Sequence, residues 1–223
     1  KTMSRGRLVM DLLHGKPVPA EVAVQRQYGS WNVLTVDARR REPVVEYATC
    51  VPAGYSLAGQ HNNRVIGEGV HAVSNSHLDD PTWPKVEFLR KELASLLEDS
   101  DSLPAVPPCP FGGEGGSEQR GRRYVRVDET PKIVLLLAER LLCAKPGFPQ
   151  ASHPNVPGAS SLEMESYLQS SVFLSDKSRP YGTRSQTVVI ACPRTQVLYY
   201  CHREVSRGGV LHPFTTIALS LQD

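Results

Sequence analysis

An asparagine and an arginine are well placed in this sequence to bind a small molecule. Asn75 follows an alternating apolar stretch in GVHAVSNSHLDDPTWPK (residues 69–85), and Arg184 precedes another in RSQTVVIA (184–191). Because antiparallel pairing brings the end of one strand to the beginning of its neighbour, we expect both side chains at one pocket. There an amide and a guanidinium would donate hydrogen bonds to an anionic group.

Each side chain also has a structural interpretation. Asn and Ser favour turns and helix caps, so Ser74 and Asn75 also fit a plain connection between a strand and a helix. Arg184 also fits an ordinary ion pair. The sequence leaves both interpretations open.

Composition limits the class of protein. The 223 residues have 40% apolar content and a net charge of +2, which suits a globular domain without a nucleic-acid partner. No apolar run approaches the roughly 20 residues that cross a bilayer, so no integral membrane span is expected. The first residues, KTMSRGRLVM, lack the apolar stretch of a signal peptide, and we expect a cytoplasmic protein.

The cysteines and histidines predict no metal site. The five cysteines are widely spaced and include no CxxC pair, which argues against zinc and against a disulfide framework. The seven histidines have no recognised ligand spacing. This cysteine usage favours a reducing, intracellular compartment.

Hydrophobic periodicity predicts an α+β fold. Helices are expected over residues 7–13, 84–98 and 131–142. Strands are expected over 31–38, 44–51, 65–73, 171–174, 186–191, 196–205 and 213–221, with two hairpins, 31–51 and 186–205. Because helices and antiparallel strands come in blocks, we expect antiparallel sheets with helices on their outer faces.

One domain over residues 1–223 is expected, with two interruptions. Residues 99–130 are rich in Pro, Gly, Ser and charge, and cannot bury enough apolar area to offset their ordering entropy, so they predict a disordered insertion. Residues 144–161 carry four prolines and predict a loop.

Two stretches in order resemble the NRDE family, whose eukaryotic members are the transport and Golgi organization protein 2 homologues. They are SN (74–75) followed by PTWPK (81–85), and PYGTRSQT (180–187) at the start of a hydrophobic strand. Shorter matches are SRG (4–6) before a helix, YG (28–29) before NVL (32–34), and the closing strand 215–221. The N-terminal cysteine and the Asn-Arg-Asp-Glu signature of the family are absent, so we expect an N-terminally truncated member.

The resemblance implies a fold like that of the N-terminal nucleophile hydrolases, of whose αββα sandwich this chain would hold a part. In the related choloylglycine hydrolase type, an N-terminal Cys attacks an amide, a strand-end Asn holds the oxyanion and a late Arg completes the pocket. On this analogy Asn75 and Arg184 are catalytic-pocket remnants, and the ligand-binding neighbours are Ser74, Trp83, Tyr181 and Thr183. Without the nucleophile, this chain is expected to be inactive as an enzyme.

The resemblance also implies a role in intracellular trafficking, Golgi organisation and secretion, with a cytoplasmic, Golgi-associated or mitochondrion-associated location. The expected partner is a small hydrophobic or anionic ligand, and haem or a lipid is the candidate cargo. One alternative is a cysteine-dependent amide hydrolase in the full-length form. Another is a scaffold without a pocket, which would recruit partners through residues 99–130.

Overall fold

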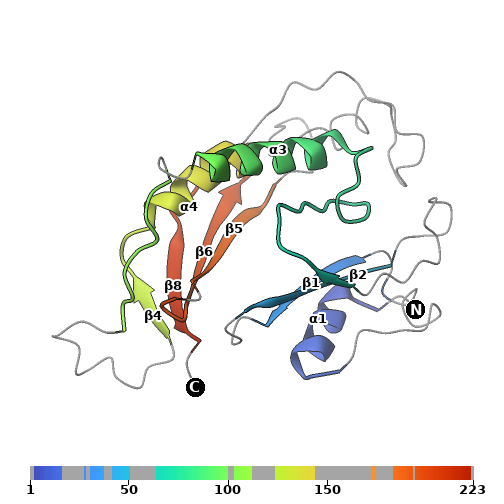
Figure 1. The fold of residues 1–223 in the computed structure, drawn as a ribbon, viewed down its shortest axis with the longest axis horizontal. Helices are drawn as coiled ribbons and strands as arrows, with labels where there is room; N and C mark the ends of the chain where they lie inside the picture. Colours follow the sequence, from blue (N-terminus) through green and yellow to red (C-terminus); the bar gives the residue numbers. More distant parts are fainter. Residues whose placement is uncertain are drawn as a thin grey trace.

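A computed structural model describes residues 3–16, 28, 31–37, 42–50, 64–99, 103–111, 124–143, 172–173, 183–192 and 194–221. These residues form two antiparallel sheets and a small set of helices (Figure 1). The α+β class expected from the sequence is confirmed.

The first sheet is built from the N-terminal part of the chain. Its order is β1 (Trp31–Asp37), β2 (Val44–Cys50), β3 (Arg64–Ile66), and β1 and β2 form the predicted hairpin. Helix α1 (Arg5–Leu13) begins at Ser4, whose hydroxyl accepts a hydrogen bond from the Gly6 amide at 3.2 Å. The helix buries Leu8 against Trp31 and Ala48 of the sheet.

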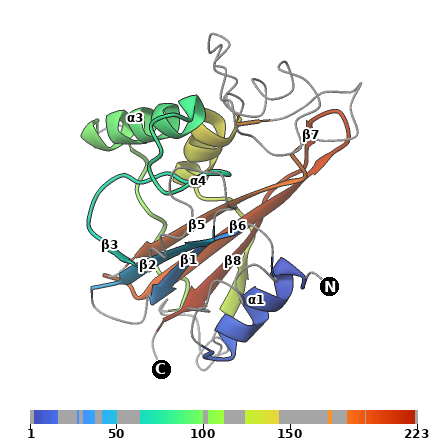
Figure 2. The ribbon, with the colours of Figure 1, turned by 90° about the vertical axis from the view of Figure 1, so that its right-hand side faces the viewer.

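The second sheet is built from the C-terminal part. Its order is β4 (Tyr124–Val127), β8 (Thr215–Ser220), β6 (Val197–Ser206), β5 (Ser185–Cys192), and the short β7 (Val210–Leu211) pairs with β6. Its buried residues Val188, Tyr199 and Ala218 pack with Val134 of helix α4 (Lys132–Leu137). Helices α3 (Pro84–Glu98) and α4 lie on one side of the two sheets and α1 on the other (Figure 2).

The predicted strand 65–73 is wrong over most of its length. Strand β3 ends at Ile66, and the chain continues without regular structure to α3. Gly69 has a φ of 144°, which side-chain-bearing residues rarely adopt, so the extended ladder cannot continue through it. Asn75 therefore does not stand at the end of a strand.

Two parts of the predicted insertion 99–130, residues 103–111 and 124–130, belong to the described structure. Strand β4 pairs with the edge of β8, and Val125 is buried there. Upstream, Cys109 and Phe111 pack against the same core. Composition could not reveal this, because β8 is the partner and lies some ninety residues further along the chain. Residues 100–102 and 112–123 of this segment lie outside the described part, as does the whole of the predicted loop 144–161.

Two further predictions need adjustment. The helix expected over 131–142 is present, but its second half is the π-helix η2 (Ala138–Leu142), closed by a hydrogen bond from the Cys143 amide to the Ala138 carbonyl at 2.8 Å. Of the expected strand 171–174, residues 172–173 are described, and they are not in a strand. No helix in the described ranges has the length and apolar content to cross a bilayer.

Candidate functional site

Asn32 holds the irregular segment after β3 against the first sheet. Its side-chain nitrogen donates to the backbone carbonyls of Ser74 and Ser76, both at 2.8 Å. These two carbonyls flank Asn75. A single amide group on β1 therefore fixes the backbone on both sides of the residue that the sequence singled out.

The oxygen of the same amide accepts two hydrogen bonds. Tyr47 and Thr49 of β2 donate their hydroxyl protons to Asn32 Oδ1, each at 2.7 Å. The Tyr47 oxygen in turn accepts the Leu78 amide at 3.1 Å, and burial raises the pKa of this phenol. The phenol therefore stays protonated and can serve as the donor that the network needs.

Asp79 fixes the start of the segment. Its carboxylate lies 2.7 Å from His71 Nδ1, accepts the Ala72 amide at 2.9 Å and lies 3.4 Å from the Arg90 guanidinium. Burial raises the pKa of Asp79, but these partners outweigh burial and hold the pKa below its ordinary value. Asp79 also adopts a positive φ of 60°, which aspartate tolerates.

Asp80 fixes the entry to α3. The residue is 4% exposed, and its carboxylate accepts hydrogen bonds from the Ser76 hydroxyl, from the Thr82 amide at 2.9 Å and from the Thr82 hydroxyl at 2.7 Å. Burial raises the pKa of Asp80, but these hydrogen bonds outweigh burial, so the pKa is lowered overall. Asp80 therefore acts as a buried structural anion.

Trp83 and Lys85 lie at the first turn of α3. Trp83 is fully buried, and the Lys85 ammonium lies 5.3 Å from the centre of its ring. Burial lowers the pKa of Lys85 to about 8. A sizeable fraction of this lysine is consequently neutral at slightly alkaline pH.

An apolar groove runs along the free edge of β1. Helix α1 contributes Val9, Leu12 and Leu13, and the opposite wall includes Leu198 and Leu221. The groove has a volume of about 910 Å³ and is lined by residues 32 to 37 of β1. Among the described strands β1 lies at an edge of its sheet, so the backbone groups that pair with no described strand also face this space.

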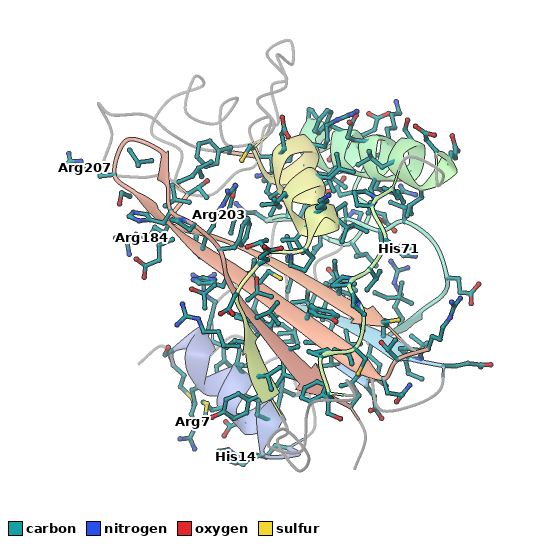
Figure 3. All side chains as sticks on the ribbon, turned by 90° about the vertical axis from the view of Figure 1, so that its left-hand side faces the viewer. Arg7, His14, His71, Arg184, Arg203 and Arg207 are labelled. Atoms are coloured by element: carbon teal, nitrogen blue, oxygen red, sulfur yellow. The ribbon has the colours of Figure 1, made fainter. Side chains whose placement is uncertain are left out.

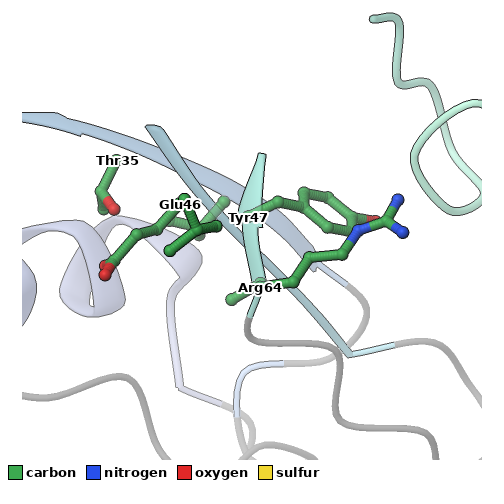
Figure 4. Close-up of a pocket in the computed structure, with 7 residues that line it drawn as sticks. Thr35, Glu46, Tyr47 and Arg64 are labelled. Atoms are coloured by element: carbon green, nitrogen blue, oxygen red, sulfur yellow. The ribbon is translucent and has the colours of Figure 1, made fainter. Parts of the chain in front are cut away.

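A smaller hollow of about 160 Å³ lies on the first sheet between β1, β2 and β3 (Figure 4). Thr35, Glu46 and Arg64 are among its lining residues. The Arg64 guanidinium lies 6.0 Å from the Tyr47 ring, at the outer limit of a cation–π contact. This hollow is too small for more than a few atoms of a ligand.

A family model described as Transport and Golgi organisation 2 matches residues 1–204. The chain belongs to the Transport and Golgi organisation 2 family. No curated protein and no solved structure matches it. The family resemblance drawn from the motifs at residues 74–85 and 180–187 is confirmed.

In this family member the predicted pair Asn75 and Arg184 is not brought together. Asn75 is exposed and lies beside the first sheet, whereas Arg184 is exposed next to the start of β5 in the second. Figure 3 shows Arg184 and His71, which is four residues before Asn75, on opposite sides of the molecule. Neither Asn75 nor Arg184 lines the groove or the hollow.

The other predicted site residues are also dispersed. Ser74 contributes its carbonyl to the Asn32 contact, and Trp83 is a core residue. Thr183 precedes Arg184 at the second sheet, and Tyr181 lies outside the described residues. Ligand-binding roles for these four stay predictions.

The hydrogen-bond network around Asn32 was not expected from the sequence. Tyr47 and Thr49 alternate along β2 and pair with β1 residues, so their hydroxyls share a face with Asn32. Three polar residues, Asn32, Tyr47 and Thr49, on one face of an otherwise apolar hairpin could have indicated this network. Within the described ranges no group of three or more potential ligands could hold a metal ion.

Proposed function

We propose that this member of the Transport and Golgi organisation 2 family binds an apolar, lipid-like ligand in the groove along β1 and carries it during intracellular trafficking. The groove is the single observation that carries the proposal. Its volume of about 910 Å³ lies within the range of ligand-binding pockets, and most of its lining side chains are apolar. Haem, a large and mostly apolar molecule, is the second candidate cargo.

Exposure supports a binding role for the groove. Leu13 is 76% exposed, Val36 56% and Val9 50%, although all three face the same space. Exposed apolar groups gathered around one groove favour association with an apolar partner. The family match supports trafficking and Golgi organisation as the setting, and the proposed location is the cytoplasmic side of Golgi membranes.

Binding is favoured over amide hydrolysis. Among the described residues that line the groove there is no cysteine, and the polar ones are Asn32, Thr35, Asp37 and Glu46. Cysteine-dependent hydrolysis needs a thiolate next to the scissile carbonyl. The hydrolase alternative therefore rests on the family resemblance alone, and this groove does not support it.

The test is a binding titration with two probes, an environment-sensitive fluorescent fatty acid and haemin. We expect fluorescence enhancement or a shifted Soret band with the unmodified chain, and a loss of at least tenfold in affinity for Leu13→Asp and Val36→Asp. Both positions are exposed, so a charge there leaves the fold intact while placing an ion in the apolar groove.

Leu97→Asp is the matched control. Leu97 is 50% exposed on α3, away from the groove, and the substitution should leave binding unchanged. If neither probe binds the unmodified chain, or if Leu97→Asp weakens binding as much as Val36→Asp does, the groove is not the ligand site.

A further inference from the structure

The β6–β7 hairpin has a firmly built tip. Residues 207–209 form the turn, in which Gly208 and Gly209 have φ values of 86° and 82°. The Gly209 amide donates to the Ser206 carbonyl at 3.0 Å, and the Ser206 hydroxyl lies 2.6 Å from His212 Nε2 across the hairpin. The tip therefore presents its side chains in a defined arrangement.

Two apolar residues of the tip face solvent. Val210 is 60% exposed and Leu211 is 39% exposed, and their strand β7 pairs with β6 alone among the described strands. Figure 2 shows this hairpin at the far end of β6, away from α1. Apolar side chains at a projecting tip add nothing to the core, so they suggest contact with something outside the molecule.

Arginines stand beside these apolar residues. The Arg184 carbonyl accepts the Val205 amide at 2.8 Å, and Val205 pairs with Leu211 on its other side. Arg184, Val205 and Leu211 thus form one row across three chain segments. Arg207 occupies the turn itself, and Figure 3 shows Arg184 and Arg207 at the same end of the sheet, pointing outward.

Neither Arg184 nor Arg207 forms an ion pair with any residue in the described part of the chain. Arg203 is different, because it donates to Gln186 at 2.8 Å and stacks 4.4 Å above the Phe214 ring. By strand alternation the nearby acid, Glu204, lies on the opposite face from Val205 and Leu211 and on the same face as Ser206 and its pair Val210.

We propose that the β6–β7 hairpin is a membrane-docking tip, which inserts Val210 and Leu211 among the lipids of an anionic bilayer while Arg184 and Arg207 bind the phosphate headgroups. An apolar tip flanked by basic residues matches the two layers of a membrane surface, apolar inside and anionic outside. Two apolar side chains and two arginines give weak, reversible binding, as a protein that visits membranes requires.

The experiment is flotation of the full chain with vesicles of phosphatidylcholine alone or with 30% phosphatidylserine, a proportion of about one anionic lipid in three. We expect binding to the anionic vesicles and its loss at high salt, because salt screens headgroup attraction. Each arginine contributes about fivefold, so Arg184→Gln with Arg207→Gln should weaken partitioning about 25-fold. Val210→Ser with Leu211→Ser should weaken it at least tenfold.

Matched controls and a gain-of-function variant complete the test. Val65→Ser and Arg126→Gln change exposed residues on other strands and should bind as the unmodified chain does. Val210→Trp should strengthen binding, with a blue-shifted emission that brominated lipids quench, because the native Trp31 and Trp83 are buried. The proposal is overturned if the new tryptophan does not respond to anionic vesicles, or if binding survives both double variants.

Discussion

Asn32 and Ser76 are 44 positions apart, and the Asn32 side chain donates to the Ser76 carbonyl at 2.8 Å. The same amide holds Ser74, so replacing it frees the segment that leads into α3. We expect Asn32→Ala to lower the free energy of unfolding by about 2 to 4 kcal/mol, since Tyr47 and Thr49 also lose their acceptor.

Chemical denaturation measures this effect. Asn75→Ala is the matched control, because Asn75 is the same residue type between the two held carbonyls but is exposed. Its effect should stay within about 0.5 kcal/mol. Equal losses for the two variants would contradict a structural role specific to Asn32.

Asp80 should make the free energy of unfolding depend on pH in the acid range. Its pKa is lowered in the folded state, so its contribution is present above the unfolded pKa of about 3.9 and is lost as pH falls through the folded pKa. Asp80→Asn should lower the free energy of unfolding by about 1 to 3 kcal/mol at pH 7. Below about pH 4 this variant should lose less further stability than the unmodified chain does. Ser76→Ala keeps the hydrogen bonds from Thr82 to Asp80. In thermal melts its melting temperature should lie between those of the unmodified chain and Asp80→Asn at each pH.

Lys85 should make the free energy of unfolding depend on pH in the alkaline range. Its pKa falls to about 8 in the folded state, below the ordinary 10.5, so the unfolded state binds more protons between these values and stability rises with pH there. At pH 7 the partly buried ammonium opposes folding, and Lys85→Met should raise the free energy of unfolding by about 1 to 2 kcal/mol. Urea titrations at pH 7 and pH 10 should show this advantage shrinking; an advantage that grows with pH would refute the mechanism.

Tyr199 should anchor the segment before β4. Its hydroxyl donates to the carbonyls of Pro107 and Pro108, at 3.2 and 2.8 Å, and the residue is 1% exposed. Tyr199→Phe should cost about 1 to 2 kcal/mol, whereas Tyr200→Phe, at a 38% exposed neighbour, should change the melting temperature little. Similar melting temperatures for both variants would show that the two proline carbonyls do not depend on Tyr199.

Local patterns in the sequence determined the elements that depend on nearby residues. Helices α1 and α3 and the β1–β2 and β5–β6 hairpins follow from apolar spacing, Ser4 and Pro84 at helix starts, and short turns. The motifs also determined the family, since residue identity in order is enough for that assignment. None of these conclusions requires knowing which distant segments meet.

Tertiary structure decided where the chemistry lies. Strand β4 exists because β8 offers it an edge, and Asn32 became the anchor because β1 passes beneath the carbonyls of Ser74 and Ser76. Arg184 lies beside the β6–β7 hairpin and not beside Asn75, because its carbonyl accepts a hydrogen bond from the Val205 amide. Such contacts join residues tens of positions apart, and their energy depends on the register of whole sheets, which no local pattern of side chains specifies.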